Sequence, residues 1–169
     1  MPKYRTTVHI DAPAEKVWDV IGDFPNIYKF NPAVPASNAT SEDTTGLGAT
    51  RHCDLSVLGA SIEERIVDWN DGKSYTVELY ETKRVPLLKN NVGHVGVEPN
   101  GNGSTGIFEV SYDIKGSVFG RLMHSVAIEK QTVKTAQLFV AGLKHYVETG
   151  EEVSKGVRVD TSQVELTRA

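Results

Sequence analysis

Residues 99–114, PNGNGSTGIFEVSYDI, decide between two classes of fold. The glycines match the pattern GxGxxG from Gly101 to Gly106, by which dinucleotide-binding loops are often identified. In such a loop the pattern follows a strand and opens a helix, because the helix N-terminus holds the phosphates. Here the residues after Gly106 alternate between apolar and polar up to Ile114, as in a half-buried strand. We therefore expect a β-hairpin connection and no nucleotide site.

The N-terminal part of the chain predicts one strand and two short helices. Residues 4–10 alternate between apolar and polar, which indicates a strand with one apolar face. Residues 11–15, DAPAE, combine an N-capping acid with a proline suited to the first turn of a helix, and Gly22 ends that helix. Residues 26–30 are expected to form one more helical turn before Pro32 makes the chain extended.

Six further strands are expected between residues 34 and 114, separated by turn-forming residues. The last element is a long helix over residues 118–149, whose apolar residues recur at steps of three, four and seven. They are Leu122, Val126, Val133, Ala136, Val140, Leu143 and Val147. This stripe requires burial, and an antiparallel sheet with one apolar face is the available surface. The sequence therefore predicts an α+β fold in which a curved, seven-stranded antiparallel sheet wraps around the C-terminal helix.

Length and composition restrict the classes of function. A chain of 169 residues is most simply one domain, here residues 1–150, followed by a polar tail of residues 151–169. The net charge of −4 argues against nucleic acid as a partner, which normally requires clustered Lys and Arg. The single cysteine, Cys53, and the lack of a secretory pattern predict a cytoplasmic protein, and the apolar runs are too short for a membrane helix.

Several stretches resemble the SRPBCC superfamily. Residues 10–24, IDAPAEKVWDVIGDF, are similar to the opening of its polyketide cyclase/dehydrase branch, and residues 30–34, FNPAV, to its aromatic-x-Pro turn. Residues 48–51 and 64–68 resemble the next two strands of that branch, and residues 142–144 resemble the end of its long helix. The superfamily includes START lipid-binding domains, polyketide cyclases, birch-pollen-allergen proteins and abscisic-acid receptors.

The resemblance implies a helix-grip fold with a cavity between sheet and long helix for an apolar or amphipathic small molecule. It does not name the molecule, because the superfamily includes both carriers and enzymes, so chemistry must be argued from the site. Strand alternation indicates which side chains face such a cavity. The candidate ligand-binding residues are Phe30, Arg51, Cys53, Glu64, Tyr75, Asn91, Phe108, Tyr112, Val126 and Val133.

Arg51 and Glu64 are the most informative of these candidates. They point inward on neighbouring strands, where they either anchor a polar group of a ligand or only satisfy each other. Glu64 matches a glutamate that abscisic-acid receptors use in their ligand network, whereas the cavity tyrosine of those receptors falls at Asn91. Tyr75 and Tyr112 either hydrogen-bond a ligand or are core tyrosines.

Two further residues each allow two interpretations, and the cysteine and histidines give no sign of metal binding or of a reactive thiol. Phe30 closes one end of the cavity or only fixes a turn to the helix, and Glu129 faces either the cavity mouth or water. Cys53 is expected to be an inert buried thiol. The histidines, Cys53 and the acidic residues show no metal-ligand spacing, so neither a metal nor a cofactor is expected, and no catalytic residue is assigned.

Three functions remain open. The first is binding of a hydrophobic or amphipathic small molecule, polyketide-, isoprenoid- or lipid-like, and it requires only the cavity. The second is a cyclase, aromatase or dehydratase that uses Arg51, Glu64 and a tyrosine. The third is a ligand-gated interaction protein in which residues 86–88 and 116–120 become ordered. Ligand binding requires the fewest functional side chains and is the preferred interpretation. The sequence does not predict the oligomeric state.

Overall fold

The computed structural model describes residues 2–57, 59–85, 88–114, 118–153 and 157–168, with side chains omitted at 88–89, 114 and 118–125. In chain order the elements are β1 (Lys3–Ile10), α1 (Ala14–Ile21), the 3-10 helix η1 (Phe24–Lys29), β2 (Ala36–Ala39), β3 (Thr50–Asp54), β4 (Ser61–Asn70), β5 (Ser74–Lys83), β6 (Leu88–Asn100), β7 (Gly103–Ile114), α2 (Val118–Thr149) and β8 (Glu165–Arg168). The segments expected to order around a ligand, 86–88 and 116–120, lie largely outside the described residues.

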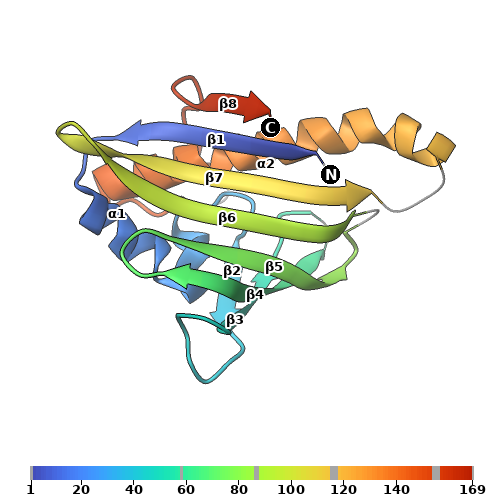
Figure 1. The fold of residues 1–169 in the computed structure, drawn as a ribbon, viewed down its shortest axis with the longest axis horizontal. Coiled ribbons are helices and arrows are strands. Elements are labelled where there is room, and N and C mark those ends of the chain that lie inside the picture. The colour runs from blue at the N-terminus through green and yellow to red at the C-terminus, as the bar shows by residue number, and fades with distance from the viewer. Residues whose placement is uncertain (1, 58, 86–87, 115–117, 154–156, 169) are drawn as a thin grey trace.

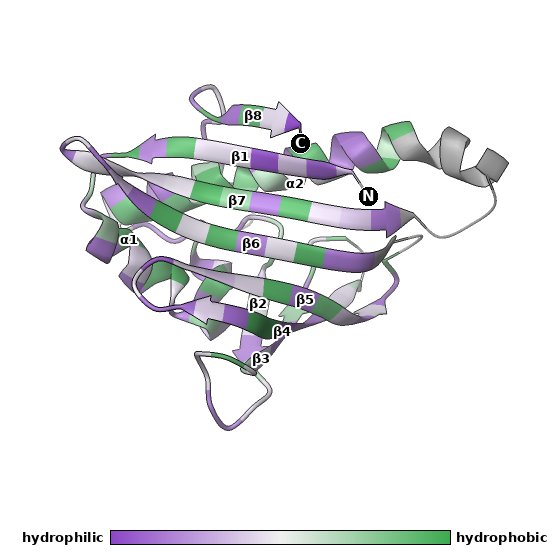
Figure 2. Cartoon of the chain, viewed as in Figure 1, coloured by the Kyte–Doolittle hydropathy of each residue, from purple (hydrophilic) through white to green (hydrophobic). Residues whose placement is uncertain are grey.

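The strands form one antiparallel sheet in the order β2-β3-β4-β5-β6-β7-β1-β8. The long helix α2 lies behind this sheet, alongside β1 and β7 (Figure 1). Hydrophobic and hydrophilic residues alternate along β5, β6 and β7, as expected for strands with one buried face (Figure 2). The predicted α+β helix-grip fold is therefore confirmed, with eight strands where seven were expected.

The glycine-rich stretch is a β-hairpin, as predicted. Asn100 pairs with Gly103 at the end of β6 and β7, and Gly101 in the turn has φ +59°. Gly106 faces the core, where an added Cβ would lie 3.0 Å from Ile10 and 3.4 Å from Leu143 of α2. The glycines therefore form a turn and let α2 approach the sheet closely.

The eighth strand lies in the segment that was expected to be only a polar tail. Residues 165–168 pair with β1, with Tyr4 opposite Arg168 and Thr7 opposite Glu165. All four residues of β8 are exposed, so this strand has no alternation by which the sequence could reveal it. The β1 edge supplies free backbone groups for the pairing, which any extended segment can use.

The inner face of the sheet is the face that packs against α2. Thr6 is fully buried, and its hydroxyl lies 3.1 Å from the carbonyl oxygen of Phe108 and 3.2 Å from that of Ala136 in α2. The rings of Phe108 and Phe139 stack with centroids 4.4 Å apart. These contacts link β1, β7 and the middle of α2.

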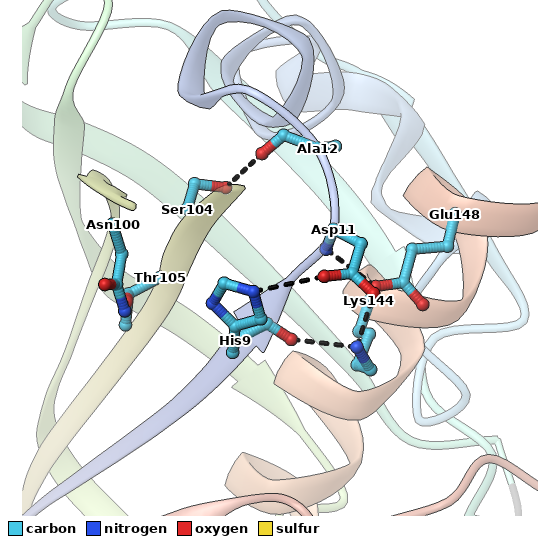
Figure 3. Close-up of polar contacts among 8 residues, drawn as sticks. All are labelled: His9, Asp11, Ala12, Asn100, Ser104, Thr105, Lys144 and Glu148. Carbon is cyan, nitrogen blue, oxygen red and sulfur yellow. Dashed lines mark hydrogen bonds and ion pairs between the residues drawn. The ribbon is translucent and has the colours of Figure 1, made fainter. Parts of the chain in front are cut away.

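One end of the sheet is tightly fixed to α2, and we call it the hairpin end (residues 9–12, 99–106 and 139–149). Lys144 donates to the carbonyl oxygen of His9 at 2.9 Å, and Glu148 accepts from the backbone N–H of Asp11 at 2.8 Å (Figure 3). Gly142 packs against the carbonyl oxygen of Phe30 so closely that an added Cβ would overlap it. The C-terminal part of α2 therefore has little freedom to move.

Only part of the predicted helical stripe is buried. Ala136, Val140, Leu143 and Val147 are in the core, as expected, whereas Val126 is 57% exposed. Val126 lies in the N-terminal part of α2, about two to three turns before the buried Ala136. The 3.6-residue period continues to Val126, but this side chain is not covered by the rest of the protein, so its expected burial is wrong.

Candidate functional site

A buried ion pair lies on the inner face, formed by the two residues singled out in the sequence. Arg51 of β3 and Glu64 of β4 are direct cross-strand partners. Arg51 Nε and Nη2 each lie 2.6 Å from Glu64 Oε2. Arg51 Nη1 donates to the carbonyl oxygen of Phe24 at 2.5 Å, and the guanidinium lies 4.0 Å from the centre of the Phe24 ring. Arg51 therefore fixes η1 against the sheet.

The pair is almost completely removed from water, since Arg51 is 2% and Glu64 7% exposed. Burial is the largest single influence and acts to lower the pKa of Arg51. Attraction to Glu64, Cys53 and Tyr75, together with the hydrogen bond to Glu64, outweighs it and raises the pKa, so the guanidinium stays charged. The Cys53 thiol lies 3.7 Å from Glu64 Oε2, and burial raises the pKa of this thiol well above its usual range. Cys53 is therefore neutral, as expected of an inert buried thiol.

The two oxygens of Glu64 differ in their contacts. Oε2 is engaged by Arg51 and Cys53, whereas no described residue hydrogen-bonds to Oε1. Arg51 directs its donors to Glu64 and to Phe24, so a ligand carboxylate would have to compete with both. The geometry suits a ligand group that donates a hydrogen bond to Glu64 Oε1 better than one that accepts from Arg51.

Tyr75 belongs to the same buried cluster. Its ring contacts Phe24 at 5.8 Å and stacks on Trp69 at 5.8 Å between centroids. Its hydroxyl is buried and makes no hydrogen bond with the described residues. Burial raises the pKa of Tyr75 to about 12, although the nearby Arg51 acts to lower it. The phenol therefore stays protonated at neutral pH and is available as a donor.

Other polar side chains lie on the inner face at the same level of the sheet. Glu64 pairs with Leu79 on β5, Glu78 pairs with Val92 on β6, and Val92 pairs with Ser111 on β7. The neighbouring inward positions on β6 and β7 are Asn91 and Tyr112. We use the name polar row for the inward residues Arg51, Glu64, Asn91 and Tyr112 together with Tyr4 of β1, whose ring stacks on Tyr112 at 6.4 Å.

Tyr4 is the member of the polar row that the sequence analysis did not select. It is 2% exposed, and its hydroxyl makes no hydrogen bond of ordinary geometry with the described residues. Burial, helped by the nearby Glu129 carboxylate, raises the pKa of Tyr4 to about 12. The alternation of residues 4–10 already placed Tyr4 inward, so the signal was present but indicated only a core position.

The remaining candidates are apolar and make their contacts within the core or lie near the surface. Phe30 is 2% exposed and meets Phe139 edge to face, with centroids 5.3 Å apart. Phe108 stacks on Phe139, so both phenylalanines belong to the packed core beside the C-terminal part of α2. Val133 is half-buried, and Val126 is exposed. The structure therefore brings Arg51, Cys53, Glu64 and Tyr75 together, and Phe30 and Phe108 belong to the same hydrophobic core as Cys53 and Tyr75.

Two hollows of the structure are smaller than ordinary ligand pockets, which enclose about 300 Å³ or more. One of about 170 Å³ lies between η1 and Val153, and one of about 70 Å³ lies between α1, η1 and Tyr146. Neither is the sheet–helix cavity that the resemblance implies. In the part of the chain that the structure describes, no group of three potential ligands could hold a metal ion, and no helix is long and apolar enough to span a membrane.

Comparison with solved structures shows the same fold in distant proteins. A START superfamily protein from Mycobacterium smegmatis is 15% identical, with a TM-score of 0.70 over 88% of this chain and 98% of that chain. A protein from Thermus thermophilus is 18% identical, with a TM-score of 0.68 over 86% and 97%. Major latex-like protein 151 from Panax ginseng is 14% identical, with a TM-score of 0.66 over 85% and 95%.

No curated protein matches the chain. Residues 1–148 match the family described as "Polyketide cyclase / dehydrase and lipid transport", which is nearly the whole of the segment over which the sequence resembles the SRPBCC superfamily. The observed fold, an antiparallel sheet packed on a long helix, agrees with this match. The chain therefore belongs to the polyketide cyclase/dehydrase and lipid transport family of the SRPBCC superfamily.

Proposed function

We propose that this protein binds a hydrophobic or amphipathic small molecule, polyketide-, isoprenoid- or lipid-like, between the inner face of the sheet and α2. The observation that carries the proposal is the Arg51–Glu64 pair, which places two charges on a face otherwise suited to an apolar partner. The family description, which names polyketide and lipid chemistry, supports the same class of ligand.

The unequal use of the Glu64 carboxylate favours a binding role over a purely structural one. A buried ion pair gives little net stability, because removing two charges from water offsets their attraction. Glu64 Oε1 has no partner among the described residues and is not one of their fully buried unpaired atoms, so it is open to a hydrogen-bond donor from outside the protein. A hydroxyl of the ligand would donate to this oxygen while its apolar body contacts the remainder of the inner face.

The part of α2 opposite the hairpin end supports entry of a ligand. Glu129 has a side chain 34% exposed and Val126 is 57% exposed, whereas Ala136 and Val140 are fully buried. Segments with few buried contacts open at a lower free-energy cost than segments fixed in the core. We infer that a ligand enters by displacing the part of α2 around residues 126–133, so the small hollows of the closed structure do not limit ligand size.

Native mass spectrometry of the freshly purified protein, followed by denaturing extraction, tests this function. We expect an apolar molecule to be retained, and less of it per folded molecule in Glu64→Gln. Glu63→Gln is the matched control, because Glu63 is the next residue of β4 and contacts His52 on the outer face. Unchanged retention in Glu64→Gln would assign the pair to structure alone. A protein that retains nothing and binds no fatty acid, isoprenol or aromatic polyketide would contradict the proposal.

A cyclase or dehydratase is the second candidate, and Tyr75 is the observation that favours it. A protonated, unpaired phenol beside Arg51 is suited to donate a hydrogen bond or proton to a ligand carbonyl. Mass spectrometry of the ligand over time distinguishes the two candidates. Dehydration lowers the ligand mass by one water, at a rate that Tyr75→Phe would reduce, whereas a binding protein returns its ligand unchanged.

A further inference from the structure

The polar row contains a second group of side chains, remote from the Arg51–Glu64 pair, with unmet hydrogen-bonding capacity. Two buried polar atoms there have no hydrogen bond of ordinary geometry with the described residues: the hydroxyl of Tyr4 and Oδ1 of Asn91. The Glu129 carboxylate of α2 interacts with the Tyr4 hydroxyl, and it belongs to the part of the helix that a ligand is proposed to displace. Their residues are 2% and 8% exposed. A buried polar atom without a partner costs roughly 1–3 kcal/mol, so such atoms are uncommon unless something else satisfies them.

Strand register brings these two residues together around Tyr112. Tyr4 pairs with Val110 on β7, and its ring stacks on that of Tyr112. Val92 pairs with Ser111, which places Asn91 beside Tyr112 on the adjacent strand. Three neighbouring strands, β1, β7 and β6, therefore contribute a phenol, an aromatic ring and a carboxamide to one place on the inner face.

The backbone of β6 is irregular next to Asn91. The register between β6 and β7 shifts between Lys89 and Val92, and Asn90 has φ +51°. Bulges of this kind redirect side chains and occur often beside functional sites. Left-handed backbone at a residue other than glycine is uncommon, although asparagine tolerates it well. The irregular backbone therefore lies directly beside the buried carboxamide of Asn91.

We propose that Tyr4, Asn91 and Tyr112 form a subsite for a hydroxyl group carried on a flat ring of the ligand. This inference rests on the proposed function and defines the chemistry of its ligand. A ligand hydroxyl is suited to both atoms, because it donates to Asn91 Oδ1 and accepts from the Tyr4 phenol in place of the Glu129 carboxylate. The stacked rings of Tyr4 and Tyr112 provide aromatic surface for the ring that carries it. A phenolic or hydroxylated polycyclic molecule has this chemistry, whereas a saturated fatty acid does not.

Binding of 2-naphthol and 2-methoxynaphthalene, measured by isothermal titration calorimetry, tests the subsite. The two probes share a ring system and an oxygen, but only 2-naphthol donates a hydrogen bond. We expect the protein to bind 2-naphthol about ten-fold more tightly, the value of one hydrogen bond. Asn91→Leu is expected to reduce this preference and to leave the affinity for 2-methoxynaphthalene unchanged. Tyr4→Phe removes the donor to the oxygen that both probes carry, so it is expected to weaken the binding of both.

Tyr80→Phe is the matched control for Tyr4→Phe: Tyr80 is an exposed tyrosine of β5, so this variant should keep the affinity for both probes. Tyr4→Phe removes a single oxygen, so it remains informative if Asn91→Leu does not fold. Equal affinity of the unmodified protein for both probes would overturn the subsite and leave the proposed function standing. Failure to bind either naphthalene compound would also overturn the subsite, whereas the proposed function is contradicted only if the protein binds no fatty acid or isoprenol either.

Discussion

The hairpin end and the polar row differ in how their buried polar groups are satisfied. At the hairpin end the fully buried Ser104 hydroxyl donates to the carbonyl oxygen of Ala12 at 2.9 Å (Figure 3). Of the buried side-chain atoms described there, only His145 Nε2 has no hydrogen bond, and Glu151 Oε2 lies 3.6 Å from it. In the polar row Tyr4 and Asn91 each contain a buried polar atom without a partner among the described residues.

This difference separates the part of the molecule that maintains the fold from the part available for a ligand. Satisfied hydrogen bonds and close packing give stability, whereas unmet hydrogen-bonding groups reduce it and persist where a ligand completes them. The same division applies to α2, which is fixed around Gly142 and exposed around Val126. One helix therefore contributes both to the core and to the proposed entrance.

The largest effect is expected from breaking the one satisfied pair of the polar row. Arg51→Met leaves Glu64 buried without its partner, so we expect the free energy of unfolding to fall by about 4 kcal/mol in urea denaturation. The double variant Arg51→Met/Glu64→Leu removes both charges and should recover most of that loss. A single-variant loss below about 1 kcal/mol would mean that Glu64 reaches water without Arg51.

Adding one methyl group to the fixed part of α2 should have the next largest effect. Gly142→Ala places a Cβ on the carbonyl oxygen of Phe30, and we expect it to destabilise the protein by about 3 kcal/mol. Ala127→Gly removes a methyl from the exposed part of the same helix and should cost only about 1 kcal/mol, the difference in helix propensity. Similar losses in thermal denaturation would show that α2 is equally fixed along its length.

Removing one hydroxyl from the hairpin end and one from the polar row makes the comparison more specific. Ser104→Ala loses a satisfied buried hydrogen bond, and we expect a loss of about 1 kcal/mol in the free energy of unfolding. Tyr4→Phe removes a hydroxyl that has no hydrogen bond of ordinary geometry and interacts with the partly exposed Glu129 carboxylate, so we expect a smaller loss than for Ser104→Ala. If Tyr4→Phe were the more destabilising variant, its hydroxyl would have a structural partner and would not be free for a ligand.

The smallest effect on stability is expected from the outer face of the sheet, which belongs neither to the hairpin end nor to the polar row. His52 contacts Glu63 and Asp54, and the hydrogen bond with Glu63 is the main reason that its pKa is raised. The stabilisation from protonated His52 is complete below the unfolded-state pKa of about 6.5 and is lost as pH rises through the higher folded-state pKa.

His52→Gln should therefore reduce stability at low pH by less than about 1 kcal/mol and have no effect at high pH. Denaturant midpoints at several pH values measure this difference. Ligand binding should not change in this variant, because His52 lies on the face opposite the polar row. A loss of binding would show that the outer face contributes to the site.

Local patterns were sufficient to predict most of the fold. Alternation and turn residues gave the hairpin at residues 100–103 and the seven strands from β1 to β7, and helical periodicity gave α2. The strand β8 was missed because all of its side chains are exposed, and only the free edge of β1 determines its position. The exposure of Val126 was missed because periodicity shows which face of a helix is apolar and not how far the covering sheet extends.

The candidate site was predictable where strand alternation determines it. Arg51 and Glu64 were correctly placed as inward neighbours, but the contacts of Arg51 with Phe24 required the path of η1 across the sheet. The place of Tyr4 in the polar row required the order β6-β7-β1, which brings the first strand of the chain next to β7. Sequence patterns give the direction of a side chain, whereas its neighbours across the sheet depend on topology.

Titration with 2-naphthol, followed by two-dimensional NMR of the backbone amides, tests the central claim most directly. We expect the largest chemical-shift changes at Glu64, Asn91 and Tyr112, together with the part of α2 around Glu129. The amides of Ser104 and Lys144 at the hairpin end should change little. Changes concentrated at the hairpin end or on the outer face, or no changes at all, would contradict the assignment of the polar row as the ligand site.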